Sequence, residues 1–226
     1  MSAEAATRDQ SGDWRRGVRT LPGIAGIGYT VAWIASLTVG PSPSPGVTGA
    51  QLLAAYAGHD GSGMANFVLT EGVTAVFLAI VVLFTARAAR RAGARRAALA
   101  VAGFGLVAAA MSWAELAMGG WLIFGPVASR QAASGGSLFG TIDRVDGSKM
   151  FVLAAMAVTL TVLAAAAVVL PRWLASFGLL LAAALVVSGL GFVTLSAGLS
   201  DAVNVSAPLL LVVVTATGVT LRTGAA

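Results

Sequence analysis

Two glutamates lie inside long apolar segments of this 226-residue chain, and they are the residues best placed to do chemistry. Glu71 belongs to the apolar segment 64–86, and Glu115 belongs to the segment 97–124. Each segment is long enough to cross a bilayer, where an ionisable side chain is costly and usually has a function. The two glutamates therefore predict a site inside the membrane.

The chain between the two segments indicates that the glutamates come to a similar height. A turn of about ten residues, rich in arginine, joins the segments, so two antiparallel neighbouring helices are expected. Glu71 lies about seven residues, roughly 10 Å, inside the outer end of its span, and Glu115 reaches the outer third of the membrane from the inner side. If the two side chains meet, they would share a proton and titrate as a unit. A proton-coupled carrier or an intramembrane acid catalyst needs this arrangement.

Side chains beside the two glutamates complete the predicted site. We predict ligand binding by the following residues: Glu71, Glu115, Asn66, Thr74, Ser112 and Trp113. If the protein is an enzyme, the predicted catalytic acids are Glu71, Glu115 and Asp201. The alternative for each glutamate is a structural hydrogen bond to a neighbouring helix, which contributes about 0.6 to 2 kcal/mol.

The remaining acids and the single histidine are assigned to the outer surface. The segment 125–149 is polar and is expected to form an outer loop, which places Lys149 at an outer helix end. Asp146-Gly147-Ser148 resembles a helix cap. Solvated loop positions and caps are the usual places for such residues, here His59, Asp60, Asp143, Asp146 and Asp201.

The composition restricts the class of protein. Hydrophobic residues make up 58% of the chain and charged residues 10%, against about 25% charged in a soluble domain. This excludes a soluble globular fold and predicts an integral membrane protein. The chain has no cysteine and only one histidine, His59, which excludes cysteine-ligated metals and bis-histidine haem. No metal and no cofactor are predicted.

The fold predicted from the apolar segments is an all-α bundle of six transmembrane helices. A disordered cytoplasmic tail is expected at residues 1–20 and a single transmembrane domain at 21–226. The spans are predicted at residues 21–40, 64–86, 97–124, 150–170, 173–195 and 208–221, with the last extended towards Asp201. Ser188, Gly189 and Gly191 are small enough to let another helix approach the fifth span closely.

Arginine sets the predicted orientation. The net charge is +5, and the basic residues beside apolar segments are expected to meet lipid headgroups, so nucleic acid is not a predicted partner. Eleven basic residues fall in the inner segments and three in the outer loops, which places both termini in the cytoplasm. We therefore expect a multi-pass protein of the bacterial cytoplasmic membrane, whose partner is the lipid bilayer. The sequence predicts no oligomeric state.

One short helix is expected outside the bilayer. The proline-rich segment Pro41–Pro45 ends the first span, because proline disfavours helix in the residue before it. Thr48-Gly49-Ala50-Gln51 then has the spacing of a capping box. We expect a short helix on the outer surface with its apolar side in the membrane interface.

Three segments carry a resemblance to a family of uncharacterised bacterial six-span membrane proteins. They are Gly23–Gly26, Pro41–Pro45 and Gly49–Ala57. This family brings no function with it. The chain also resembles integral-membrane terpene cyclases more weakly, with Glu71 and Asp201 placed like acids that protonate an isoprenoid. Those enzymes usually have seven spans, and aromatic residues are only 7% of this chain.

Three functions stay open at this point. The first is an outward-facing acidic pocket for a small amphipathic or cationic ligand or a proton, in a carrier, a sensor or an accessory subunit. The second is an intramembrane acid catalyst acting on an isoprenoid or lipid. The third is a membrane scaffold whose small-residue faces dock a partner helix. A retinal protein is excluded, because the single lysine is not expected in the middle of a last helix.

Overall fold

The computed structural model describes the backbone of residues 3–223 and the side chains of residues 20–222. Over this range the chain is helical and contains no strand. Six segments are long and apolar enough to cross a membrane: Thr20–Val39, Asp60–Arg91, Arg95–Val127, Ala132–Ala165, Trp173–Thr194 and Ala197–Arg222. The predicted all-α, six-span fold class is therefore confirmed.

Some spans are built from more than one helical element. In chain order the elements are α1 (Ala3–Val39), α2 (Gly49–Tyr56), α3 (Asp60–Phe67), η1 (Val68–Val73), α4 (Thr74–Arg91), α5 (Arg95–Leu122), η2 (Ile123–Val127), α6 (Ala132–Ala165), α7 (Trp173–Thr194), α8 (Ala197–Ser200) and α9 (Val203–Thr223). The elements η1 and η2 are π-helical turns that continue α3 into α4 and extend α5. The disordered tail expected at residues 1–20 falls, apart from Thr20, on residues whose side chains the structure does not describe. The disorder of this tail therefore stays a prediction.

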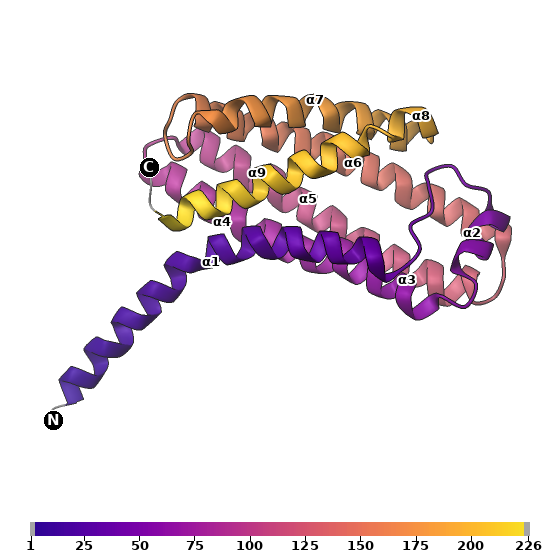
Figure 1. Cartoon of the computed structure of the whole chain (residues 1–226), viewed down its shortest axis with the longest axis horizontal. Coiled ribbons are helices and arrows are strands. Elements are labelled where there is room, and N and C mark those ends of the chain that lie inside the picture. The colour runs from indigo at the N-terminus through magenta and orange to yellow at the C-terminus, as the bar shows by residue number, and fades with distance from the viewer. Residues whose placement is uncertain (1–2, 224–226) are drawn as a thin grey trace.

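The six long helices form a closed ring. Helix α1 packs on α4, α4 on α5, α5 on α6, α6 on α7, α7 on α9, and α9 packs back on α1. The α4–α5 turn, the α6–α7 turn and the end of α9 lie at one end of the ring, and α2, α3 and α8 lie at the other (Figure 1). The arginines of the α4–α5 turn mark the first end as the inner one in the predicted orientation.

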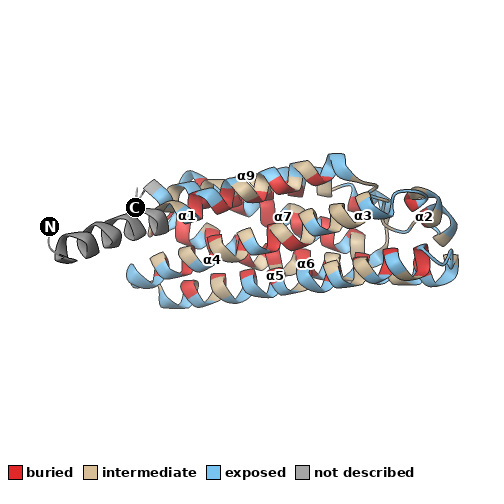
Figure 2. Cartoon of the chain, turned by 90° about the horizontal axis from the view of Figure 1, so that it is seen from below, coloured by how far each residue is buried: buried red, intermediate tan, exposed pale blue. Residues whose placement is uncertain are grey.

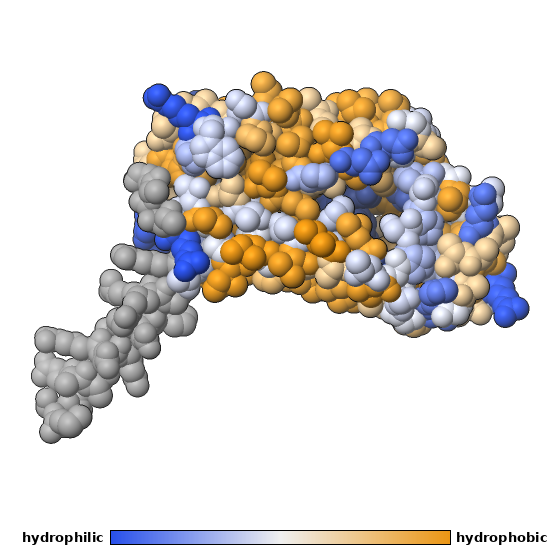
Figure 3. All heavy atoms as spheres, viewed as in Figure 1, coloured by the Kyte–Doolittle hydropathy of each residue, from blue (hydrophilic) through white to orange (hydrophobic). Residues whose placement is uncertain are grey.

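Apolar side chains fill the inner half of the ring and also cover its outside. Val81, Val101, Leu163 and Leu181 are fully buried between the helices. Many other large apolar residues are exposed on the outer faces of the helices, among them Val31, Leu83, Leu99, Val162 and Leu179. The buried residues follow the inward side of each helix, and the outer surface is largely hydrophobic (Figures 2 and 3). This pattern is typical of a bundle surrounded by lipid.

The segment 125–149 is not a loop, and this expectation was wrong. It forms η2, a short turn and the first half of α6, which begins at Ala132. Its glycines and polar residues resemble a loop, but Phe139 and Ile142 continue the buried side of the helix at a spacing of three residues. Lys149 is therefore in the middle of α6. Without it the basic residues divide eleven to two, which leaves the predicted orientation unchanged.

Helix α2 has the predicted start but a different environment. The Thr48 side chain accepts a hydrogen bond from the Gln51 backbone N–H, and the Gln51 side chain accepts one from the Thr48 N–H, so the capping box is present. The apolar side of the helix lies against the protein, because Leu52 and Tyr56 are buried in a cluster with Phe139 of α6. We expected the apolar side of this helix in the membrane interface, and this expectation was wrong, because α6 is longer than predicted and provides a protein surface against which that side packs.

Gly189 of the fifth span does allow a close approach, and its partner is α6. A Cβ added to Gly189 would lie 2.9 Å from the carbonyl oxygen of Gly147, and a Cβ added to Gly147 would lie 2.8 Å from that of Gly189. Bare backbone at both positions thus lets α6 and α7 pack closely. This contact holds the polar half of α6 inside the bundle.

Candidate functional site

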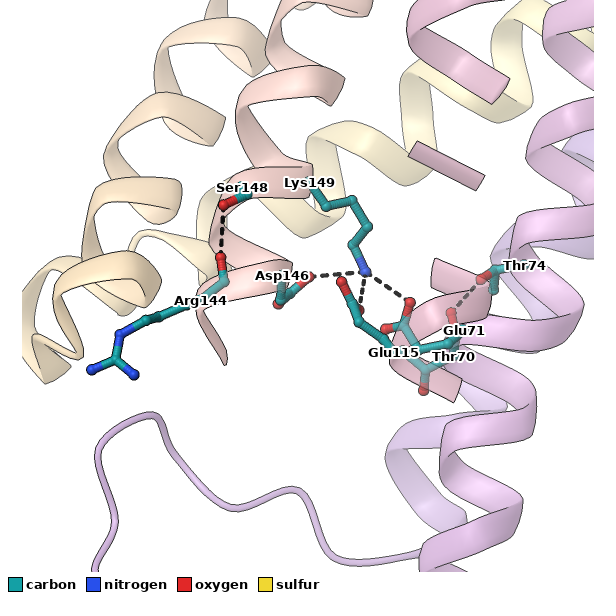
Figure 4. Close-up of polar contacts among 8 residues, drawn as sticks. All are labelled: Thr70, Glu71, Thr74, Glu115, Arg144, Asp146, Ser148 and Lys149. Atoms are coloured by element: carbon teal, nitrogen blue, oxygen red, sulfur yellow. Dashed lines mark hydrogen bonds and ion pairs between the residues drawn. The ribbon is translucent and has the colours of Figure 1, made fainter. Parts of the chain in front are cut away.

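The ammonium group of Lys149 lies at the centre of a buried charged cluster. Its Nζ is 2.7 Å from Glu71 Oε2, 2.6 Å from Glu115 Oε2 and 2.9 Å from Asp146 Oδ1 (Figure 4). The whole Lys149 residue is only 7% exposed. We call these four residues the lysine cluster. It connects three neighbouring elements of the ring, η1, α5 and α6.

Local structure explains how each side chain of the lysine cluster reaches the centre. Glu71 lies in the π-helical turn η1, where the Thr74 N–H donates to the carbonyl of Leu69, five residues back. Such a wide turn shifts the side chains that follow it and often occurs at functional sites. The Thr74 hydroxyl donates to the Thr70 carbonyl in the same turn. Asp146 and Lys149 are three residues apart and thus share one face of α6.

The expectation that the two glutamates meet is confirmed, although they meet differently from the way we predicted. Carboxylate oxygens of Glu71, Glu115 and Asp146, one from each residue, lie within 4.8 Å of one another. An ammonium group lies among them, so the glutamates contact Lys149 instead of sharing a proton between themselves. Three carboxylates at this spacing have the geometry of a cation site, and the cation in it is the lysine side chain.

A cavity of about 680 Å³ adjoins the lysine cluster in the outer half of the ring. This volume is in the range of pockets that bind small molecules. All four members of the cluster are part of its wall, together with Asp143 of α6. Six aromatic residues also line it: Tyr29, Trp33, Tyr56, Phe67, Phe139 and Phe192. Burial raises the pKa of Tyr56 to about 12, so this phenol stays neutral at physiological pH.

Several buried acceptors on the cavity wall have no hydrogen-bond partner within the protein. Among the described residues these are Glu115 Oε1, Asp143 Oδ2 and Thr70 Oγ1. Glu115 is 1% exposed and Asp143 is 5% exposed. Buried polar atoms are normally paired, so this wall offers acceptors to a further donor.

The cavity opens where α1 and α9 separate. In their inner halves the two helices are joined by a hydrogen bond of 2.7 Å between Thr30 and Thr215. Towards the outer end, the carbonyl of Ser36 in α1 accepts from Asn66 of α3. Ser206 of α9 pairs with Ser188 of α7 at 3.0 Å. The two helices therefore bind different neighbours and diverge, as Figure 1 shows.

Residues from both diverging helices and from the loop between α1 and α2 line this opening. They are Trp33 and Leu37 of α1, Asn204 and Ala207 of α9, and residues 42–45 of the loop. The molecular surface is hollowed at this place, with hydrophilic atoms around the hollow (Figure 3). Leu37 and Asn204 are exposed, so the opening faces both the outer end and the side of the bundle.

The structure brings together most, but not all, of the residues that the sequence indicated. Asn66, Thr74 and Ser112 line the cavity with the two glutamates. Asp201 is exposed and lines the cavity. Among the described residues, no ion pair or hydrogen bond joins its side chain to the lysine cluster. Trp113 is 51% exposed and does not line the cavity. It is two positions from Glu115, about 200° around the helix, and is therefore excluded from the candidate site.

Sequence reasoning missed the contribution of α6. Asp143, Asp146 and Lys149 were assigned to an outer loop, whereas they lie on one face of a helix. Their spacing of three residues was the available signal, since it repeats along one side of a helix. By contrast His59 and Asp60 are exposed at the start of α3, as expected for surface residues.

Comparison with protein-family models, with curated proteins and with solved structures found no match. The resemblances to six-span bacterial proteins and to terpene cyclases therefore stay predictions.

Proposed function

We propose that this protein binds a small amphipathic organic cation in the cavity of its outer half. The observation that supports this proposal most directly is the lysine cluster itself. Three carboxylates surround an ammonium group at the wall of a cavity of about 680 Å³. A wall that already binds one ammonium group has the chemistry needed to bind another.

The charge of the cavity favours a cation. When all its groups are ionised, the lysine cluster has three negative charges and one positive charge, a formal balance of −2. Asp143 on the same wall adds another carboxylate. Uncompensated charge inside a membrane protein is costly, so a cationic ligand or protons would stabilise this cavity, whereas an anion would not.

The aromatic lining favours an organic cation over a bare ion. The chain has sixteen aromatic residues, two Tyr, five Trp and nine Phe, and six of them line the cavity. Aromatic faces attract alkylammonium groups, by roughly 0.5 to 2 kcal/mol for each contact. Aromatic residues that are scarce over the whole chain are thus concentrated where a cation would bind.

The position of the opening favours an amphipathic ligand. It lies between the outer halves of α1 and α9, and the exposed apolar residue Leu37 lines it. A ligand with an apolar tail can therefore approach from the outer leaflet with its charged head towards the lysine cluster. This binding step is common to a carrier, a sensor and an accessory subunit.

A second candidate function is acid catalysis on an isoprenoid or other lipid-soluble substrate. Glu115 Oε1 is buried and unpartnered, and aromatic rings line the same cavity, as a carbocation intermediate requires. The ion pairs of Glu71 and Glu115 with Lys149 favour the binding function, because both carboxylates already hold an ammonium group.

A binding measurement with matched amphiphiles tests the proposal. Dodecyltrimethylammonium should bind the purified protein in nanodiscs with a measurable heat, whereas neutral dodecanol should bind at least tenfold more weakly. Glu71→Gln should weaken binding of the cation about tenfold, because it removes one of the carboxylates that face the cavity. Asp60→Asn, an exposed control at the start of α3, should leave binding unchanged.

The same samples separate the alternatives. Equal binding of the cation and the alcohol, or equal binding by Glu71→Gln and the wild type, would refute the proposed site. Turnover of a prenyl diphosphate or a linear isoprenoid, lost in Glu115→Gln, would instead establish the catalytic function.

A further inference from the structure

We infer that Lys149 is a tethered competitor, whose ammonium group occupies the position that a ligand's primary ammonium group takes in the lysine cluster. This inference rests on the proposed function and adds a regulatory role for one residue. Among the organic cations that the cavity binds, a primary alkylammonium group would then be the kind that displaces Lys149 from the lysine cluster.

The geometry around Nζ is that of a complete ammonium site. A primary ammonium group has three N–H donors and no acceptor. Lys149 has three carboxylate partners at 2.6–2.9 Å, one from each of η1, α5 and α6. A ligand with a terminal –NH₃⁺ group could make the same three contacts, whereas a trimethylammonium group has no hydrogen to donate.

A second observation shows that the cluster has more acceptors than Lys149 uses. Glu115 is 1% exposed, and its Oε1 has no hydrogen-bond partner within the described part of the chain, although its Oε2 contacts Lys149. Both glutamates lie at the wall of the cavity, and their carboxylates point towards the lysine (Figure 4). An incoming ammonium group can therefore contact Glu115 before Lys149 has left.

Asp146 can still bind the Lys149 ammonium group after a ligand has displaced it from the two glutamates. Asp146 lies on the same helix three residues away, and its side chain is 23% exposed, more than either glutamate. Lys149 can keep this local partner while a ligand binds Glu71 and Glu115 on the other two elements. The exchange would then replace the side-chain link from α6 to η1 and α5 with a link through the ligand.

Chemical rescue tests this inference directly. Lys149→Ala removes Cγ, Cδ, Cε and Nζ, which n-propylammonium replaces atom for atom. At pH 8, in detergent, saturating n-propylammonium should raise the Tm of Lys149→Ala by about 5–10 °C and that of the wild type by less than about 1 °C. n-Propanol is the neutral control and should not rescue. In Lys149→Ala/Glu115→Gln the concentration needed should rise at least tenfold.

A second variant keeps the inference testable if Lys149→Ala does not fold. Lys149→Met keeps most of the length of the side chain, which is shorter by one atom, and removes the competing charge. Dodecylammonium should bind Lys149→Met at least tenfold more tightly than it binds the wild type. Unchanged or weaker binding by Lys149→Met, or equal rescue of Lys149→Ala by n-propanol, would overturn the competitor role.

The results also separate this inference from the proposed function. If the wild type binds dodecyltrimethylammonium but Lys149→Met gains nothing with dodecylammonium, the competitor role fails and the cavity proposal stands. If the wild type binds neither cation while Lys149→Ala is rescued by n-propylammonium, the ammonium position is established and the proposed function fails.

Discussion

The inner and outer halves of this bundle use the same six helices in opposite ways. In the inner half, apolar side chains such as Val81, Val101 and Leu181 are buried inside the ring. In the outer half, all six helices, α1, α4, α5, α6, α7 and α9, line a cavity of about 680 Å³, whose wall contains the lysine cluster. The difference shows that a tightly packed inner half can hold the helices together while the outer half stays open and polar.

The contact between α1 and α9 belongs to the packed inner half and ends where the open outer half begins. A Cβ on Gly218 would lie 2.3 Å from the carbonyl oxygen of Pro22, so glycine is needed for the close crossing of the two helices. Thr215 adds a hydrogen bond of 2.9 Å to the carbonyl of Gly26 at the same level. Beyond Thr30 the helices separate, and the opening of the cavity begins.

The largest expected effect contrasts a charge in the outer half with an apolar side chain in the inner half. Lys149→Met should lower the free energy of unfolding by about 3–5 kcal/mol at pH 8, because it leaves the carboxylates of Glu71, Glu115 and Asp146 without their counter-charge. The loss should be smaller when Glu115→Gln is also present, because one carboxylate fewer is then left without a counter-charge. Leu181→Ala should cost about 2–5 kcal/mol with or without Glu115→Gln, because it only leaves a void.

Denaturation of the two variants and the wild type in the same detergent measures this contrast. Adding Glu115→Gln should reduce the loss in Lys149→Met and leave the loss in Leu181→Ala unchanged. An equal effect of Glu115→Gln in both variants would show that the lysine cluster is not the source of the difference between the two halves.

A smaller effect is expected where α1 crosses α9. Gly218→Ala should cost about 1–3 kcal/mol, because the new methyl group would meet the backbone of Pro22 and push the helices apart. Gly198→Ala in α8 is the matched control, since an added Cβ there has nothing within 4 Å. Thermal unfolding should separate the two variants, and equal Tm values would contradict a close crossing at Gly218.

The smallest effect concerns the two tryptophans on opposite sides of the wall. Trp33 lines the cavity, whereas Trp113 faces outward. Trp33→Ala should raise the Kd for dodecyltrimethylammonium about threefold to thirtyfold, through loss of one cation–π contact. Trp113→Ala should leave the Kd unchanged in the same titration. A larger effect from Trp113→Ala would place the ligand outside the cavity.

Two kinds of feature that depend only on neighbouring residues were predicted correctly. Six spans follow from the length and apolarity of each segment, and the capping box at Thr48 follows from residues three positions apart. Glu71 and Glu115 were also recognised, because an acid within an apolar segment is visible without knowledge of its neighbours. Their similar height followed from the short turn between their helices.

The all-helical fold, the number of spans and two of the four members of the lysine cluster were thus predictable from the sequence. The group that lies between the two glutamates became visible only in the folded bundle. Lys149 is 78 residues from Glu71 and 34 from Glu115, and it belongs to a stretch whose glycines and charges resemble a loop when considered alone. Hydropathy and helix caps depend on residues that are close in the sequence. The partner of a buried charge depends instead on which helices the ring places side by side.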